Sequence, residues 1–345
     1  GRCNHHRPQR ASEASILLRR SEFFPSCTGR TRSIIPRFMH LRTLGALAFV
    51  ISASLPAFAA PISQSLSDKS GRLSLAWQLD AGVLTYTVTS TAAGLAVEVI
   101  GRSPLGLTRA DQPFVADLEF VSASPVRTID EAYSLVAGKR REIRNQAVEQ
   151  TYRFRNAHGS AIELIVRVME DGIAFRYAFP DAGPGSLKLI GESTGFRLPC
   201  DGFAWMLPYD RLVEWSPSYE MPWQNRIPVG KTAEEIYAGW AFPALFNVRG
   251  RWVMVTEAAM DGTCFAVHLE AEALGGLYRV RLPEENETYG VAEQAATITV
   301  PWQSPWRVIL VGETLASIVE SDAVTDLSAP CEIADTSWIK PGRVS

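Results

Sequence analysis

The chain has 345 residues, of which 46% are hydrophobic and 21% are charged, and its formal net charge is −3 at pH 7. The charges are unevenly placed, because residues 1–59 hold nine arginines, two glutamates and no lysine. The remainder keeps 25 basic residues (34 less 9) and 35 acidic residues (37 less 2), a charge of −10. An acidic surface of this kind argues against nucleic acid and anionic membranes as partners.

Residues 39–59 have the three parts of a secretory signal peptide. The short basic segment Met39-His-Leu-Arg42 precedes the apolar run Leu44–Ile51, and Ala57-Phe-Ala59 forms a small-residue cleavage site. We expect cleavage after Ala59 and a periplasmic or secreted product; a buried helix over the apolar run is the alternative. Residues 1–38 are Arg-rich and aperiodic, and we interpret them as upstream translation. No later apolar run reaches the roughly 18–20 residues of a membrane span.

From residue 60 onward, short segments of period-two alternation predict β structure almost throughout. Leu73–Leu79 and Val83–Thr89 alternate clearly, with Asp80-Ala-Gly82 as the turn between them. The other predicted strands are 95–100, 116–122, 149–155, 161–169, 172–179, 186–191, 204–207, 250–257, 263–269, 276–282, 296–300 and 306–312. This pattern predicts an all-β fold for residues 60–334, with two large sheets packed face to face.

Turn and helix signals lie between these strands. Asn156–Gly159 is a predicted hairpin turn, and a turn at Gly101–Pro104 is expected to end the strand before it. Helix signals are few. Thr314–Ser321 predicts a helix with Thr314 as its N-cap, and Thr232–Ile236 predicts a single helical turn.

The cysteines and histidines indicate no catalytic or metal motif. Beyond residue 59 the cysteines are Cys200, Cys264 and Cys331, whose wide spacing fits no metal site, and we expect buried free thiols unless two of them pair. His158 and His268 are far apart, and His268 lies in a predicted strand, so a packed or surface histidine is expected there. No nucleophile elbow, P-loop or dinucleotide fingerprint is present.

Aromatic and acidic residues are concentrated between Phe203 and Trp240. The set comprises Trp205, Tyr209, Trp215, Tyr219, Trp223, Tyr237 and Trp240 with Asp210, Glu214, Glu220, Glu234 and Glu235. Aromatic rings stack on sugar rings, whereas carboxylates accept bonds from hydroxyls or hold a hard cation such as Ca²⁺. Trp215, Tyr219 and Trp223 are therefore candidate sugar contacts. Packing against another domain, or an ordinary core, would also explain the composition.

Two glutamates are candidate ligands for such a cation. Glu220 lies in Ser216–Trp223, between two prolines that stiffen the loop and flanked by aromatic residues. Glu257 ends the apolar run of Trp252–Met260 and is the second candidate. A salt bridge is the alternative role for either residue.

Several blocks of sequence together resemble the N-terminal domain of glycoside hydrolase family 97, the calcium-dependent α-glucosidases and α-galactosidases. The blocks are Ser103–Leu107, Asp171–Tyr177, Glu192–Phe196, Ala204-Trp205, Tyr219-Glu220, Thr256–Ala259, Pro305–Arg307 and Asp335–Gly342. The resemblance runs from about residue 66 to residue 345, and it depends on the order and spacing of these blocks.

The resemblance implies a β-super-sandwich of the galactose-mutarotase-like kind, followed by a (β/α)8 barrel that carries the catalytic carboxylates at its strand ends. Residues 335–345 would be the linker and the first residues of that barrel, so no catalytic residue is assigned in this chain. The resemblance also implies Ca²⁺ held mostly by barrel glutamates, with one ligand from the sandwich. The block Tyr219-Glu220 is the match for that ligand, and Glu257 is held in reserve.

We therefore expect the N-terminal part of an exported glycosidase that acts on α-linked glucosides or galactosides and that pairs with its own barrel domain. The alternative from another class is a stand-alone carbohydrate-binding module that uses the aromatic cluster as its binding face. A mutarotase-like epimerase is a weaker alternative, because it would need catalytic histidines in a cleft. The sequence leaves stereochemical outcome and substrate preference open.

Overall fold

The computed structural model describes residues 60–181, 183, 185–211, 220–283, 287, 295–340 and 342, and the structural statements below refer to these residues. Nearly all of the regular structure in them is β-strand, as predicted. Among these residues no helix is long and apolar enough to cross a membrane.

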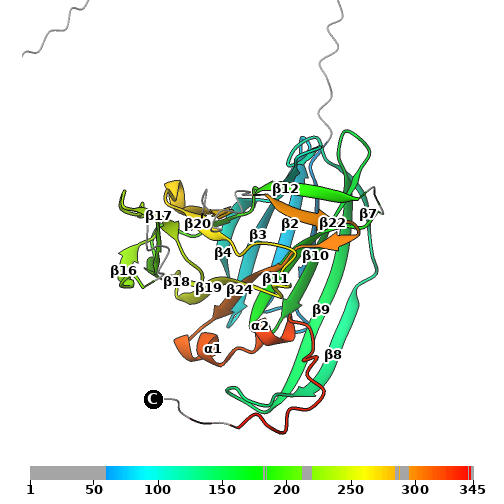
Figure 1. Cartoon of the computed structure of the whole chain (residues 1–345). Helices are drawn as coiled ribbons and strands as arrows, with labels where there is room; N and C mark the ends of the chain where they lie inside the picture. Colours follow the sequence, from blue (N-terminus) through cyan, green and yellow to red (C-terminus); the bar gives the residue numbers. More distant parts are fainter. Residues whose placement is uncertain are drawn as a thin grey trace, which may run out of the picture. The chain divides into compact units, whose positions relative to one another are not determined.

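Two large antiparallel sheets form two layers that run alongside each other (Figure 1). The nine-stranded sheet has the order β1 (Ile62–Ser67), β2 (Leu73–Asp80), β3 (Val83–Ala92), β4 (Leu95–Pro104), β13 (Gly195–Arg197), β21 (Leu277–Arg281), β20 (His268–Glu270), β17 (Tyr237–Trp240) and β15 (Pro208–Asp210).

The eleven-stranded sheet has the order β16 (Gln224–Pro228), β14 (Phe203–Met206), β18 (Ala244–Val248), β19 (Arg251–Ala258), β24 (Trp306–Gly312), β11 (Gly172–Phe179), β10 (Ala161–Met169), β9 (Glu142–Arg155) and β7 (Glu119–Ala123). Off this path, β23 (Trp302–Gln303) pairs with β11 and β8 (Arg127–Ser134) pairs with β9.

A small third sheet joins β22 (Ala296–Thr299), β12 (Ser186–Glu192), β5 (Leu107–Arg109) and β6 (Pro113–Phe114). The helical elements are η1 (Leu274–Gly276), α1 (Leu315–Glu320) and α2 (Ala323–Asp326).

The main core lies between the two large sheets because each inner face carries every second side chain of its strands. Along β2 the buried and half-buried residues alternate strictly, and Trp77 on its inner face is 1% exposed. The Trp77 ring meets the rings of Tyr152 and Phe154 from the opposite sheet edge-on, at 5.2 Å between centroids in both cases. Tyr86 and Phe175 pair across the layers in the same way at 5.0 Å. Burying each large aromatic ring stabilises the sandwich by roughly 2–3 kcal/mol.

A second, smaller core covers the other face of the eleven-stranded sheet. Ile318 of α1 and Ala323 of α2 pack there against Trp306, Val308 and Leu310 of β24. Since both of its faces are covered, β24 is buried along its whole length and reads as an apolar run rather than an alternating one.

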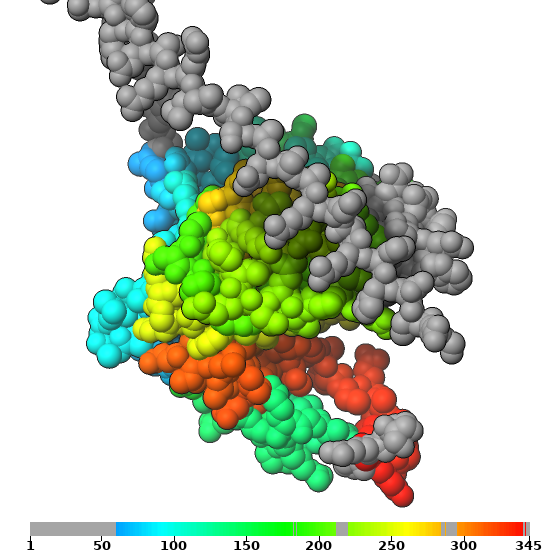
Figure 2. All heavy atoms as spheres, turned by 90° about the vertical axis from the view of Figure 1, so that its left-hand side faces the viewer, coloured from blue at the N-terminus to red at the C-terminus, as the bar shows by residue number. Residues whose placement is uncertain are grey.

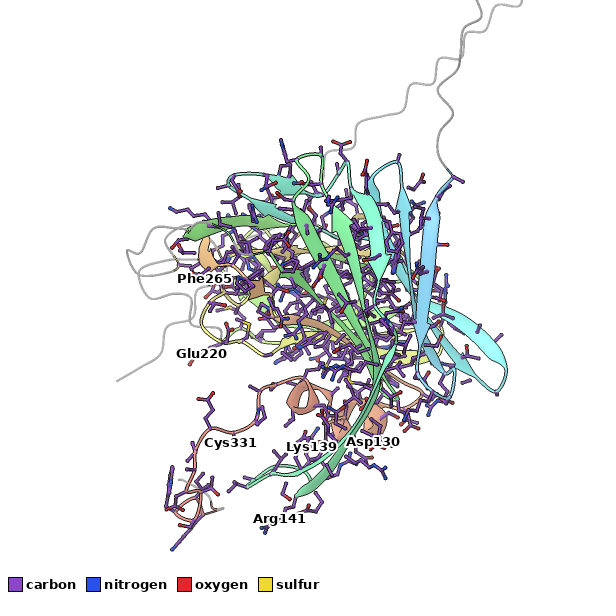
Figure 3. The ribbon with its side chains drawn as sticks, turned by 90° about the vertical axis from the view of Figure 1, so that its right-hand side faces the viewer. Asp130, Lys139, Arg141, Glu220, Phe265 and Cys331 are labelled. Atoms are coloured by element: carbon purple, nitrogen blue, oxygen red, sulfur yellow. The ribbon has the colours of Figure 1, made fainter. Side chains whose placement is uncertain are left out.

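The long β8–β9 hairpin holds these helices against the sheet (Figure 3). Near its tip, Lys139 Nζ donates to the Val319 carbonyl at 2.8 Å, and Arg140 pairs with Asp322 at 3.0 Å. The helices therefore gain their order from tertiary contacts, because isolated helices of this length are unstable in water.

Three predicted turns and caps are confirmed. The β2–β3 turn has Ala81 and Gly82 at φ 47° and 77°, which is the primed geometry that matches the twist of a tight hairpin. In the β9–β10 turn, Asn156 Oδ1 accepts hydrogen bonds from the His158 and Ser160 amides. Thr314 caps α1 by accepting from the Ser317 amide at 3.3 Å.

Four sequence predictions are wrong. Residues 101–104 do not end a strand, because β4 continues to Pro104 and pairs with β3 through a shift in register. Only the end of the predicted strand 263–269 is extended, as β20. No helix forms at 232–236, where the chain makes only a turn. The free thiols are confirmed, but Cys200 and Cys331 are exposed rather than buried.

Candidate functional site

The candidate site lies at one edge of the eleven-stranded sheet, where β14, β18 and β19 run side by side. Their register places Trp205 opposite Leu245, and Leu245 opposite Met254, on the face turned away from the main core. With neighbouring residues they line a groove of 490 Å³. Its described lining is Trp205, Trp223, Asn225, Pro243, Leu245, Trp252, Met254 and Leu315.

Aromatic rings dominate the groove. The Trp205 and Trp252 rings lie 5.2 Å apart with their planes tilted by 41°. Trp223 is 45% exposed, which is unusual for so large an apolar side chain. Of the three predicted sugar contacts, the structure places Trp223 at this groove, whereas Trp215 and Tyr219 lie outside the described residues.

Glu220 precedes the groove residue Trp223 by three positions in the chain. Its side chain is exposed, and Figure 3 places it at the margin of the molecule. Within the described part of the chain, no hydrogen bond or ion pair to its carboxylate is observed. A free, outward-facing carboxylate suits a hard cation such as Ca²⁺. In the described ranges, no three His, Cys, Asp or Glu side chains are grouped closely enough to hold a metal. Glu220 therefore fits the role of one ligand rather than a complete site.

Glu257 occupies a different environment. It lies opposite Arg307 in the β19–β24 register, and its carboxylate pairs with Arg307 Nη1 at 2.7 Å and accepts from the Val267 amide at 3.3 Å. Its side chain is 12% exposed. Burial raises the pKa of Glu257 above its ordinary value, although the attraction of Arg307 opposes the shift. Both oxygens of Glu257 are thus engaged inside the protein.

Arg307 joins two carboxylates in a buried cluster. Its Nε and Nη2 atoms bind the two oxygens of Glu192 at 2.8 and 2.6 Å, while Nη1 binds Glu257. The side chains of Arg307 and Glu192 are 1% and 3% exposed. Burial alone would lower the pKa of Arg307, but attraction to Glu192 and then to Glu257 outweighs it and raises that pKa. The cluster links β12, β19 and β24, and its least buried member is Glu257.

Comparison with known proteins identifies the family. The family model described as Glycosyl-hydrolase 97 N-terminal matches residues 67–330. The chain belongs to this family. The resemblance inferred from the sequence is thereby confirmed.

Two relatives of this glycosyl-hydrolase 97 N-terminal domain are named as galactosidases. A "Probable retaining alpha-galactosidase" of Streptomyces bingchenggensis is 30% identical over 311 residues, which cover 90% of this chain and 45% of the relative. A "Retaining alpha-galactosidase" of Bacteroides thetaiotaomicron is 23% identical over 284 residues, which cover 76% of this chain and 40% of the relative. The chain therefore spans less than half of the length of either relative.

Solved structures share the fold. A β-arabinopyranosidase crystal structure superimposes with a TM-score of 0.72 at 28% identity, over 77% of this chain and 43% of that one. A glycoside hydrolase family 97 enzyme from Pseudoalteromonas sp. strain K8, in complex with panose, superimposes with a TM-score of 0.69 at 22% identity, over 81% of this chain and 40% of that one. The predicted fold class, a β-super-sandwich, is confirmed by these neighbours.

The sequence reasoning found no role for Arg307 and Glu192 of this family 97 domain, although both lie in blocks that carried the resemblance. A signal was present, because an arginine inside the apolar run Trp306–Gly312 must find a buried partner. The partner itself could not be chosen, since Glu192 and Arg307 are 115 residues apart in the chain.

His268 behaves as a packed residue, in line with the sequence prediction. Its ring is fully buried and stacks on the Tyr209 ring at 3.9 Å, with only 7° between the planes. Burial lowers the pKa of His268 to about 4, so the imidazole is neutral at physiological pH.

The three thiols of the family 97 domain should differ in reactivity. Burial raises the pKa of the half-buried Cys264 to about 11, whereas Cys200 and Cys331 are exposed. Since the thiolate is the reactive form, we expect iodoacetamide at pH 8 to alkylate Cys264 at least about tenfold more slowly than Cys200. Mass spectrometry of the native chain measures the rates, and the urea-unfolded chain, in which the difference should vanish, is the control. Equal rates in the native chain would contradict the burial of Cys264.

Proposed function

We propose that this chain is the N-terminal β-sandwich of a secreted, calcium-dependent glycoside hydrolase that acts on α-galactosides or α-glucosides. The family match over residues 67–330, joined to the 30% identical relative named as a retaining galactosidase, carries this proposal. That name favours α-galactosides and retention of configuration. The signal peptide predicted at 39–59 extends the proposal to export through the inner membrane.

The catalytic carboxylates are proposed to lie on a barrel domain outside this chain. A retaining glycosidase needs two carboxyl groups about 5–5.5 Å apart with the sugar between them. The carboxylates Glu192 and Glu257 cannot serve, because Arg307 binds both and their side chains are only 3% and 12% exposed. The sandwich would then support the barrel and shape its site without touching the reacting bond.

Glu220 is the residue proposed to hold Ca²⁺ from the sandwich side, completing a ligand set that comes mainly from the barrel. A bound Ca²⁺ at a glycosidase site supplies positive charge that can polarise substrate oxygens. In this proposal Glu220 presents its carboxylate across the domain boundary. Glu220 can do so because it is exposed and has no partner among the described residues.

The activity test compares this chain with the polypeptide obtained by reading the gene beyond Ser345. We expect the longer protein to release nitrophenol from nitrophenyl α-galactoside or α-glucoside, to lose at least about tenfold of that rate in EDTA, and to regain it with Ca²⁺. This chain alone should release none above the blank. Hydrolysis by this chain would place the catalytic groups within it and contradict the proposal.

The groove supports a second candidate function, a stand-alone carbohydrate-binding module, because Trp223 offers an exposed ring on which a sugar could stack. Calorimetric titration of this chain with galacto- and malto-oligosaccharides distinguishes the binding module from the glycosidase domain. Saturable binding would favour the module, whereas the main proposal expects none, because most of the groove lacks hydrogen-bonding groups for sugar hydroxyls.

A further inference from the structure

Arg176 lies on the outer face of β11, the face turned away from the main core. Its neighbours along the strand on that face, Ala174 and Ala178, belong to the second core. The Arg176 guanidinium lies over the Trp306 ring of β24, 4.3 Å from the ring centroid. Arg176 is half-buried, and its Nε atom is buried without a hydrogen-bond partner. Packing therefore holds this arginine in place without an acceptor for its N–H groups.

The carboxylates of the two neighbouring strands are engaged by other arginines. Glu149 on β9 binds Arg127 and Arg167, both at 2.7 Å. Glu163 on β10 pairs with an arginine of β9 at 2.9 Å. Within the described ranges, no hydrogen bond or ion pair joins the Arg176 guanidinium to an acceptor. The chain therefore leaves this cation without a counter-ion among those residues.

The pKa of Arg176 also indicates an uncompensated charge. Burial lowers this pKa to about 10, repulsion from Arg167 lowers it as well, and attraction to Glu149 opposes both more weakly. The guanidinium still carries its proton at neutral pH, so a positive charge is held in a half-buried place. Such a charge costs free energy that an anion would recover. The Trp306 ring attracts the cation but offers no lone pair to its N–H donors.

Gln303 supplies a second polar group on the same face of the sheet. It lies opposite Ala178 in the pairing of β11 with β23, and it is exposed, whereas its neighbour Trp302 is buried in the main core. Paired residues of an antiparallel sheet share one face, and diagonal neighbours on it are within reach of long side chains. The amide of Gln303 can therefore donate a hydrogen bond to a ligand bound at Arg176.

We propose that Arg176 and Gln303 bind a carboxylate-bearing ligand, either a small free acid or the acidic group of a uronic acid. The two oxygens of a carboxylate match a parallel pair of guanidinium N–H groups. A carboxylate also brings one negative charge to one uncompensated cation, whereas a phosphate dianion would bring a second charge without a partner. The residues of this site are not among those that line the groove at Trp223, and the proposal does not depend on glycosidase activity.

Ligand-observed proton NMR of this chain at pH 7 and low ionic strength tests the proposal with acetate, galacturonate and galactose. We expect both acids to bind saturably and the neutral sugar not to bind. Arg176→Gln should weaken the binding of both acids at least about tenfold, because the charge-assisted hydrogen bonds are lost. Tighter binding of galacturonate than of acetate, with the difference lost in Gln303→Ala, assigns the ligand to a uronic acid. Equal binding of the two acids assigns it to a free acid.

A matched control makes the same substitution at an exposed arginine. Arg141 is 84% exposed in the loop that joins β8 to β9, where Figure 3 labels it. Figure 2 shows the green tip of this hairpin below the orange α1 segment. Arg141→Gln should leave the affinity for both acids unchanged. Without ligand, the urea midpoint of Arg176→Gln should stay the same or rise, because the substitution removes an uncompensated charge.

Several results would overturn the proposal. One is the absence of saturable binding of either acid, and another is binding that survives Arg176→Gln. A marked fall in the urea midpoint of ligand-free Arg176→Gln would show that a carboxylate of this chain already neutralises Arg176. Acids that bind this chain but not the longer polypeptide read beyond Ser345 would show that another part of the same protein occupies the site.

Discussion

Replacing Arg307 by methionine is expected to lower the free energy of unfolding of this chain by about 3–5 kcal/mol, because the change leaves two buried carboxylates without their cation. Glu192 loses both of its bonds to the guanidinium, and Glu257 loses one. Methionine keeps much of the volume of the arginine side chain, so a cavity contributes little to the loss. Urea denaturation monitored by tryptophan fluorescence measures the effect.

Two control variants show whether charge causes the loss. Adding Glu192→Gln and Glu257→Gln to Arg307→Met removes the stranded charges and should restore a large part of the stability. Arg144→Met breaks the exposed ion pair with Asp130 and should leave the urea midpoint unchanged, since water screens that pair. Similar losses for Arg144→Met and Arg307→Met would show that the buried cluster has no special role.

How the stability of the Arg307→Met variant depends on pH follows from the direction in which the pKa of Glu257 is shifted. The folded-state pKa of Glu257 is raised, so its contribution to stability is fully present below the unfolded pKa and is lost as the pH rises through the folded value. The attraction of Arg307 lowers this pKa, so without Arg307 the pKa of Glu257 should be raised further. The destabilisation should therefore be greatest near neutral pH and should shrink as acid protonates Glu257.

Strands with a clear apolar pattern of their own were predictable, and short strands that depend on distant pairing partners were not. β10, β11 and β24 have the predicted bounds, because each is a long segment of inward-facing or fully buried apolar residues. β13, β15 and β17 hold only three or four residues and exist through pairing with segments far away in the chain. β8 was missed for a different reason: it is an edge strand in which only Ile129 is fully buried, so there is no alternation to detect.

The candidate site was predictable only where local sequence defines it. The proline-bounded loop marked Glu220 and Trp223, and the structure places Trp223 at the groove and leaves Glu220 exposed. The groove itself depends on register: Trp205, Leu245 and Met254 become neighbours because β14, β18 and β19 pair in one particular alignment. The ion pair of Glu257 depends likewise on register, because Glu257 lies opposite Arg307 on the neighbouring strand.

Replacing Glu220 by glutamine in the full-length protein is expected to weaken Ca²⁺ binding by about tenfold or more, because affinity for Ca²⁺ depends on the number of charged ligands. Glutamine keeps the size and the carbonyl oxygen of the side chain but lacks its negative charge. Since Glu220 is exposed and unpaired among the described residues, the urea midpoint of this chain should not change. Calorimetric titration of the metal-free protein with Ca²⁺ measures the affinity.

Two further variants decide which glutamate binds the ion. Glu235→Gln makes the same change at an exposed carboxylate and should leave the titration unchanged. Glu257→Gln should also leave it unchanged, because that side chain is occupied by Arg307 and the Val267 amide. Loss of affinity in Glu257→Gln with normal affinity in Glu220→Gln would transfer the role to Glu257. Such a result would require Arg307 to release Glu257 when the catalytic domain docks, so the ion would then compete directly with the buried ion pair.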